Sequence, residues 1–190
     1  MTWELDTSHS GVTFSAKHMV VTTVRGTMAI ADATLDFDEH DPVRSSVMAR
    51  IDAASIDTRS QPRDAHLRSA DFLDVEQFPT IEFRSRSVER AGGSWKLHGD
   101  LTIRGTTHPV VLDAEFNGVQ PNLQGGRRAA FSATTTIDRE DWGLTWNVAL
   151  EQGGWLVSKQ IRIEIDLAAV EPVGATQHED AADREPAGVA

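Results

Sequence analysis

Residues 95–116 read WKLHGDLTIRGTTHPVVLDAEF, and apolar side chains occupy every second position on both sides of Arg104-Gly105. Before the turn the apolar positions run from Trp95 to Ile103, and after it they run from Val110 to Phe116. Side chains on a strand alternate between the two faces of a sheet, so this pattern predicts an antiparallel hairpin with one buried face. That apolar face must cover either a filled core or the wall of a hollow.

The same alternation recurs along most of the chain and predicts eight strands. They are expected near residues 11–17, 24–38, 45–53, 80–88, 95–103, 107–117, 127–137 and 158–169. The apolar parity changes at Ala31-Asp32, which indicates a β-bulge in the second strand. Pro109 cannot donate a hydrogen bond to a neighbouring strand, so we expect the strand near 107–117 to begin after it.

Each predicted strand has one polar face, which is typical of antiparallel sheets with one wet side. Short turns join the strands in sequence, and no Cys…Trp…Cys pattern favours an immunoglobulin sandwich. The fold class expected is therefore all-β, an eight-stranded antiparallel up-and-down barrel of the lipocalin-like kind with short helical insertions.

Two connections are long enough to hold these insertions. In residues 60–75, Ser60 can cap a turn that contains Pro62, and Ser69 or Asp71 can start a second turn. In residues 138–144, Asp138 can cap a single turn that Gly143 ends. Both insertions are expected at the ends of the barrel.

The 190-residue chain is expected to form one barrel domain over residues 1–170. Residues 171–190 hold five acidic residues, one Arg and many Ala, Gly and Pro, which predicts a disordered acidic tail. The chain has no cysteine, so disulfide and thiolate chemistry are excluded.

A net charge of −11 argues against nucleic acid and against anionic membranes as partners. No apolar run approaches the ~20 residues of a membrane helix, so stable membrane insertion is not expected. The N-terminus MTWELDTSHS lacks the basic and apolar regions of a signal peptide, so we expect a cytoplasmic location.

The size of the inward side chains bears on whether the barrel is hollow. The small inward residues are Ala16, Gly26, Ala49, Ser85, Gly99, Ala114, Ala129, Ala133 and Thr135. The large ones, expected to line a lipid-binding lumen, are Phe14, Met28, Ile30, Val47, Phe83, Leu101, Phe116, Phe131, Ile163 and Ile165. Protein interiors are densely packed, so a lining that is nearly half small residues indicates space for an apolar ligand.

An alternative is that the insertions plug this space. Their large apolar residues, which otherwise would line the mouth or lid, are Phe72, Leu73, Trp142, Leu144 and Trp146. A plugged barrel would be an interaction module without a cavity of lipid size.

Five segments carry a family resemblance. They are WELDTSHSGVTFSAKHMVVTTVRGTM (3–28), IDAASIDT (51–58), RDAHLRSADFLDVEQFPTIEF (63–83), HGDLTIRGTTHPVVL (98–112) and IDREDWGL (137–144). In this order they resemble the YceI family of polyisoprenoid-binding, lipocalin-like proteins, from Trp3 to about Val170. The resemblance implies an eight-stranded barrel, a long-chain isoprenoid lipid or similar amphiphile in its lumen, and commonly a homodimer.

The function hypothesis that follows is a non-catalytic carrier of a polyisoprenoid or related lipid, for transport, storage or sequestration, with no cofactor besides that ligand. A diphosphate or similar head group could bind arginines at the barrel mouth, and the candidates are Arg63, Arg68, Arg104 and Arg139. The alternative hypothesis is an isomerase or hydrolase that uses the barrel as a reaction chamber. Such an enzyme would place a titratable group with a shifted pKa in the lumen.

Other ionisable residues favour structural roles. His9 and His18 could join a metal site, but no known metal-binding spacing is present. Asp64 and His66 could act as acid and base, but no nucleophile motif accompanies them. We expect Arg63, Asp64, His66 and Asp71 to hold the first insertion together by caps and ion pairs, and we assign neither catalytic residues nor a metal site.

Overall fold

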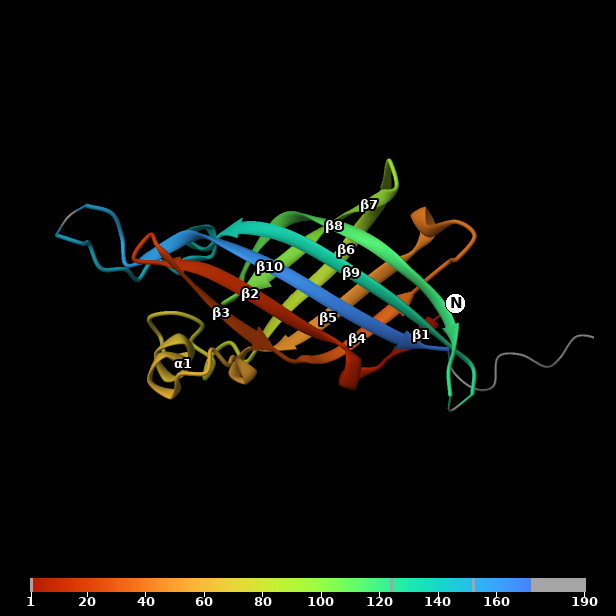
Figure 1. Ribbon diagram of the computed structural model, residues 1–190, viewed down its shortest axis with the longest axis horizontal. Coiled ribbons are helices and arrows are strands. Elements are labelled where there is room, and N and C mark those ends of the chain that lie inside the picture. Colours follow the sequence, from red (N-terminus) through yellow and green to blue (C-terminus); the bar gives the residue numbers. More distant parts are fainter. Residues whose placement is uncertain (1, 124, 152, 172–190) are drawn as a thin grey trace, which may run out of the picture.

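A computed structural model describes residues 2–123, 125–151 and 153–171 of the chain (Figure 1). The strands are β1 (Thr2–Leu5), β2 (Gly11–His18), β3 (Thr22–Met28), β4 (Ile30–Asp36), β5 (Ser46–Asp52), β6 (Thr80–Ala91), β7 (Ser94–Ile103), β8 (Thr106–Pro121), β9 (Arg127–Asp138) and β10 (Val157–Val170). The one α-helix among these residues is α1 (Gln61–Arg68), and 3₁₀ turns span Thr7–His9, Pro42–Arg44, Ala53–Ser55 and Arg139–Trp142.

The strands form one antiparallel sheet that closes on itself as a barrel with eight wall positions. β1 and β2 lie end to end along the same edge of β10, and β3 continues after Ala29 into β4. The sheet order then runs from β4 through β5, β6, β7, β8 and β9 to β10, so sequential strands are neighbours. The eight-stranded up-and-down barrel predicted from the alternation is confirmed.

One detail of the strands was expected and two were not. The register between β4 and β5 passes from Ile30 to Asp32 against consecutive partners, so Ala31 is the extra residue of the predicted bulge. The sequence analysis missed β1, because four residues with a single buried side chain, Trp3, give too short a pattern.

The predicted start of the strand after Pro109 was wrong. β8 begins at Thr106, and Pro109 pairs with Asp100 of β7. The described β8–β9 pairs begin only at Asp113, so Pro109 lies where β8 has a single partner strand. A residue without an N–H is tolerated at such a one-sided position.

Both helical insertions form. Ser60 occupies the N-cap position of α1 with Pro62 in the first turn, and Asp138 caps the 3₁₀ turn that Gly143 ends at a φ of 76°. The second helical turn expected from Ser69 or Asp71 is absent from the described residues 69–78, which instead form turns. None of the described helices is long and apolar enough to cross a membrane.

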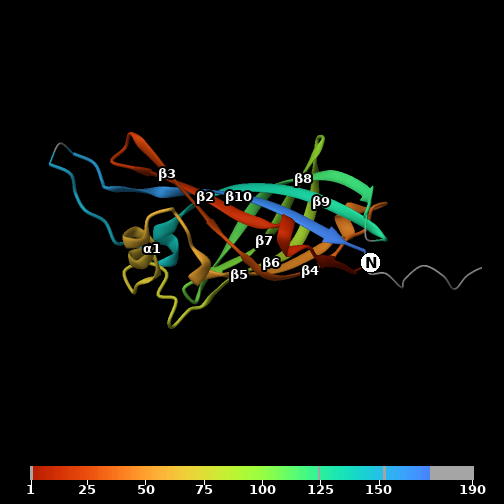
Figure 2. The same ribbon diagram turned by 60° about the horizontal axis from the view of Figure 1, so that its bottom comes forward.

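The two ends of the barrel are built differently. α1 lies at the end opposite β1, with residues 139–146 beside it (Figure 2). At the β1 end, Trp3, Phe37, Phe116 and Phe131 pack together, with ring centroids 4.9 Å apart for the two closest pairs. Aromatic rings therefore cluster at the β1 end, whereas the insertions cover the other end.

The predicted tail, residues 171–190, includes one residue that the structure describes, Glu171. Glu171 is buried, its backbone N–H donates to the Arg127 carbonyl, and its carboxylate binds the Arg127 guanidinium at 2.8 Å. Glu171 is thus part of the folded domain, because it forms an ion pair with β9. The remainder of the predicted tail, 172–190, lies outside the described residues.

Candidate functional site

The barrel is hollow. A cavity of about 590 Å³ lies in the half next to α1, and a second of about 150 Å³ lies toward the aromatic cluster of the β1 end. The two cavities share five lining residues, Val12, Ile51, Phe83, Leu112 and Ile165. The two cavities therefore lie next to each other in the lumen, with these apolar side chains at their boundary.

All ten residues predicted to line the lumen do so. Phe14, Met28, Leu101 and Ile163 line the larger cavity, Ile30, Val47, Phe116 and Phe131 line the smaller, and Phe83 and Ile165 line both. Strand alternation was sufficient to place these side chains, because in a closed barrel every second side chain of each strand points inward.

The small inward residues contribute unequally to the space. Ala16 and Thr135 line the larger cavity, and Ala49, Ala114 and Ala133 line the smaller. The interpretation of Gly26 and Gly99 as sources of empty space was wrong. A Cβ built on Gly26 would lie 2.4 Å from the Phe14 ring, and one on Gly99 would lie 2.5 Å from the Phe83 ring. These glycines make room for neighbouring rings.

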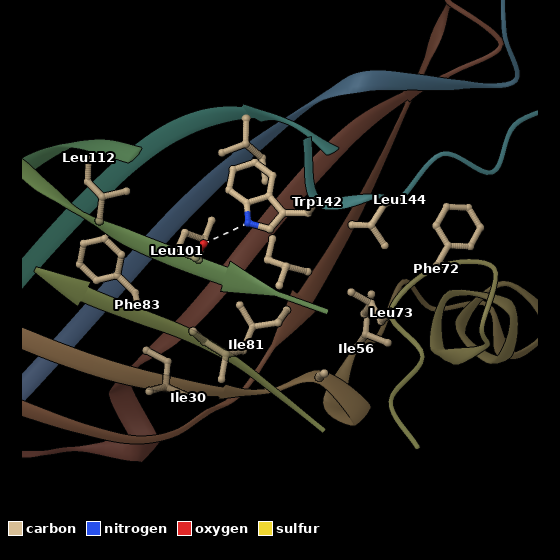
Figure 3. Packing of buried hydrophobic residues seen from close by; sticks show 14 residues of the cluster. Ile30, Ile56, Phe72, Leu73, Ile81, Phe83, Leu101, Leu112, Trp142 and Leu144 are labelled. Atoms are coloured by element: carbon tan, nitrogen blue, oxygen red, sulfur yellow. Dashed lines mark hydrogen bonds between the residues drawn. The ribbon is translucent and has the colours of Figure 1, made fainter. Parts of the chain in front are cut away.

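Four of the five residues expected at the mouth line the larger cavity: Phe72, Leu73, Leu144 and Trp146. Figure 3 shows Phe72, Leu73 and Leu144 at the α1 side of the buried cluster. They cover the cavity without filling it, so the alternative of a plugged barrel is not what the structure shows.

Trp142 has a different role. It is buried, it is not part of the cavity lining, and its indole N–H donates to the Leu101 carbonyl at 3.0 Å (Figure 3). Its ring also packs against His108, with centroids 5.1 Å apart. The predicted place of Trp142 at the mouth was therefore wrong, because its polar N–H finds a partner on β7 that holds the 3₁₀ turn against the barrel wall.

The polar part of the lining gathers at the α1 end. The polar and ionisable residues of the larger cavity are Lys17, His18, Thr58, Ser60, Arg63, His66, Thr135 and Arg139. Thr135 lies apart from this end, on β9. Because the rest of the lining is apolar, the lumen suits a ligand with one polar end and a long apolar part.

Two of the four predicted head-group arginines, Arg63 and Arg139, face the cavity. The Arg63 guanidinium donates to the hydroxyl and the carbonyl of Thr58, at 2.6 and 2.7 Å. The Arg139 guanidinium donates from Nε to the Ser158 carbonyl at 3.0 Å and from Nη1 to the Leu144 carbonyl.

The other two, Arg68 and Arg104, do not line either cavity. Arg68 donates to the carbonyls of Ala54 and Ile56, and Arg104 donates to the carbonyl of Phe72 at 3.3 Å. The Arg68 guanidinium binds the loop before α1 and the Arg104 guanidinium binds the first insertion, so their placement gives no support to a head-group role.

The residues weighed for catalysis have structural partners. Asp64 is buried and accepts hydrogen bonds from the backbone N–H and the hydroxyl of Thr58. Burial by itself would raise the pKa of Asp64, but these hydrogen bonds hold that pKa below its ordinary value. His66 binds a different carboxylate, Asp71, at 2.9 Å. Among the described residues, the expected ion pairs of the first insertion are represented by His66 and Asp71, whereas Arg63 and Asp64 hold it through hydrogen bonds with Thr58.

A metal centre has no support in the described part of the chain, where no three His, Asp or Glu side chains come together. His9 is held by Asp6 and Ser8 at 2.9 Å each, on the outside of the barrel. His18 lies in the lining of the larger cavity.

The comparisons with known proteins agree with this architecture. Residues 3–169 match the family model described as a YceI-like domain. The chain belongs to this family. A UPF0312 protein of Staphylococcus epidermidis is 37% identical over 163 residues, which cover 85% of this chain and 93% of that protein. A UPF0312 protein of Staphylococcus aureus is 37% identical over 160 residues, 84% of this chain and 91% of that protein.

Solved structures share the barrel of this YceI-like chain. BcnA of Burkholderia cenocepacia superposes with a TM-score of 0.74 at 22% identity, over 88% of this chain and all of that one. A Campylobacter jejuni YceI protein superposes with a TM-score of 0.68 at 29% identity, over 82% of this chain and 90% of that one. A third structure is a domain of Saccharophagus degradans that is described as polyisoprenoid-binding and implicated in plant cell wall breakdown. It superposes with a TM-score of 0.63 at 12% identity, over 90% of this chain and 98% of that one. At 22% and 12% identity, BcnA and the Saccharophagus domain bear on the fold alone.

Proposed function

We propose that this protein is a non-catalytic binding protein that holds a long-chain polyisoprenoid or a related amphiphilic lipid in its lumen, for transport, storage or sequestration. The observation that carries the proposal is the larger cavity, which is apolar over most of its lining and has a volume within the range of small-molecule sites. An empty apolar space of this size costs stability, and a lipid chain would recover the lost packing.

The energetics favour a ligand with several isoprene units. Each unit has about five carbons, and burial contributes ~0.8 kcal/mol per CH₂, so one unit supplies roughly 4 kcal/mol before the cost of association. Val12 and Phe83 line both cavities. If these two side chains change rotamer, the smaller cavity can accept the far end of the lipid chain. The Saccharophagus domain described as polyisoprenoid-binding has the same fold, so a barrel of this kind is compatible with the proposed ligand class.

The direct test is to purify the protein from its native host, extract it with organic solvent and identify the extract by mass spectrometry. We expect a prenyl lipid or another long-chain amphiphile. Ala16→Trp would place an indole in the larger cavity and reduce the recovered lipid by at least tenfold, because Ala16 lines that cavity.

The matched control is Ser15→Trp, since Ser15 precedes Ala16 on β2 but is not part of the lining. This variant should retain the lipid. An extract without lipid from the wild-type protein, or equal lipid in both tryptophan variants, would contradict the proposal.

An isomerase or hydrolase is the second candidate, because Arg139 lines the lumen and burial lowers its pKa. A guanidinium nevertheless stays protonated in proteins, so it can bind an anion but cannot exchange protons as an acid or base. We therefore propose binding without turnover. The test is to incubate the extracted lipid with the protein and to analyse it after release. A chemically unchanged lipid supports binding, and a new product supports the enzyme.

The proposal includes two further expectations from the sequence, a homodimer and a cytoplasmic location. Sedimentation of the purified chain measures its mass against the 20.8 kDa of one copy. Fractionation of the source cells measures the location.

A further inference from the structure

The charge inside the barrel is opposite to that of the whole protein. The chain has a net charge of −11, but each ionisable residue that lines the larger cavity is basic: Lys17, His18, Arg63, His66 and Arg139. No Asp or Glu belongs to the described lining of this cavity. The α1 end of the lumen therefore presents positive charge to whatever enters it.

Arg139 is the most deeply buried of these residues, with 3% of its surface exposed. Its Nε and Nη1 atoms donate to the carbonyls of Ser158 and Leu144, and its guanidinium lies over the Phe72 ring at 6.0 Å. Its Nη2 atom is buried and has no hydrogen-bond partner among the described residues. The guanidinium is thus fixed in place with one donor group unused.

Asp138 and Glu140, the carboxylates beside Arg139 in sequence, form no ion pair with it, although their charges raise its pKa and so offset part of the effect of burial. Asp138 accepts from the Glu140 backbone N–H and, more weakly, from Gln160 at 3.5 Å. Glu140 pairs with Lys159 at 2.7 Å. In the described part of the chain, no carboxylate lies within ion-pair distance of Arg139.

A buried cation without a directly paired carboxylate is costly, because the interior solvates charge poorly. The lowered pKa of Arg139 has this physical cause, which is burial away from water. A ligand anion next to Nη2 would remove much of this cost and use the unpaired donor, in a charge-assisted hydrogen bond.

We propose that the lipid bound in the lumen carries an anionic head group, a carboxylate or a phosphate, which binds at the α1 end with Arg139 Nη2 as its inner donor. Arg63, at the N-terminal part of α1, supplies a second positive charge at the same end. The apolar chain then extends toward Phe116 and Phe131. This inference rests on the proposed lipid-binding function and adds the chemical class of the head group.

The experiment measures binding of three probes with the same C15 chain to lipid-stripped protein by calorimetry: farnesyl monophosphate, farnesoic acid and farnesol. Inorganic phosphate, which has the anion without the chain, is the fourth probe. We expect the phosphate and the acid to bind at least tenfold more tightly than the alcohol, and inorganic phosphate to bind weakly, because both the chain and the anion are required.

Arg139→Gln should weaken binding of the two anionic probes by about 10- to 100-fold and of farnesol by less than about threefold. Arg139→Lys, which keeps the charge, should retain most of the preference. Arg104→Gln is the matched control, because Arg104, like Arg139, donates to a backbone carbonyl of an insertion but does not line the cavity. It should leave all affinities unchanged.

Equal affinity of the wild-type protein for the alcohol and the anions would overturn the inference and leave the lipid-binding function intact. An equal loss for all three probes in Arg139→Gln would overturn it as well. If Arg139→Gln fails to fold, Arg63→Gln and the probe comparison on the wild-type protein decide the question. Failure of all three C15 probes to bind would instead contradict the proposed function itself.

Discussion

At the scale of single residues, Gly99 shows that a small side chain on the inner face of a barrel need not leave empty space. Gly99 pairs with Ser85, and the ring of Phe83 lies over it. A Cβ there would meet the Phe83 ring at 2.5 Å and the Arg84 carbonyl at 2.6 Å. Since one of these contacts is backbone, a side-chain movement alone cannot relieve it.

We expect Gly99→Ala to lower the free energy of unfolding by about 1–3 kcal/mol, the usual cost of overpacking. Gly93→Ala is the control, since a Cβ on Gly93, in the turn of the same hairpin, would meet nothing within 4 Å. That change should stay within about 0.5 kcal/mol. Urea denaturation measures both variants, and equal stability of the two would contradict this account.

At the scale of elements, a buried carboxylate helps to attach α1 to the loop that precedes it. Asp64, in the first turn of α1, accepts two hydrogen bonds from Thr58 in the preceding loop. Removing the carboxylate would leave the buried Thr58 donors unsatisfied, which costs more than the hydrogen bonds gain. The position of the residues that cover the cavity therefore depends on Asp64.

We expect Asp64→Ala to lower the free energy of unfolding by about 1–3 kcal/mol and to increase the rate at which a bound lipid leaves. Asp71→Ala removes the carboxylate that binds His66 on an exposed part of the same insertion, and should cost at most about 1 kcal/mol. Thermal melts and stopped-flow release of a fluorescent lipid measure these effects. Equal release rates in the two variants would show that α1 does not control the mouth.

At the scale of the whole molecule, ion pairs join the segments near β1 to β9, and their contribution to stability depends on pH. Asp6 follows β1 and binds Arg128 of β9 at 2.8 Å. The hydrogen bond from the Ser8 hydroxyl, with those from His9 and the Ser8 backbone and the charge of Arg128, lowers the pKa of Asp6 to about 2. The Arg127 hydrogen bonds likewise lower the pKa of Glu171.

A carboxyl group with a lowered pKa stabilises the fold above its unfolded-state pKa, and this contribution is lost as the pH falls toward its folded-state pKa. For Asp6 the window runs from about pH 4 down to about pH 2. Asp6→Asn should therefore cost up to roughly 2 kcal/mol at pH 7 and little at pH 2. Melting curves across this range test it, and a constant difference would contradict the assignment.

The pattern of the sequence was sufficient for the fold and for the wall of the site. Alternation located the eight wall positions, the bulge at Ala31 and all ten predicted lumen residues, because a strand offers only two faces. It could not recognise β1, whose four residues contribute mainly Trp3 to the closure. The cap positions of both insertions could also be predicted, since they depend on adjacent residues: Asp138 and Gly143 cap the 3₁₀ turn, and Ser60 occupies the N-cap position of α1 without a side-chain hydrogen bond.

Only the tertiary structure decided how the interior is divided between protein and empty space. Whether Gly26 and Gly99 leave a void depends on which ring lies over them, and whether Trp142 lines the mouth depends on a carbonyl of another strand. The same holds for the arginines, since four similar residues separate into two that bind loops and two that face the lumen. These outcomes depend on contacts between residues distant in sequence, and strand periodicity specifies only the face on which a side chain lies.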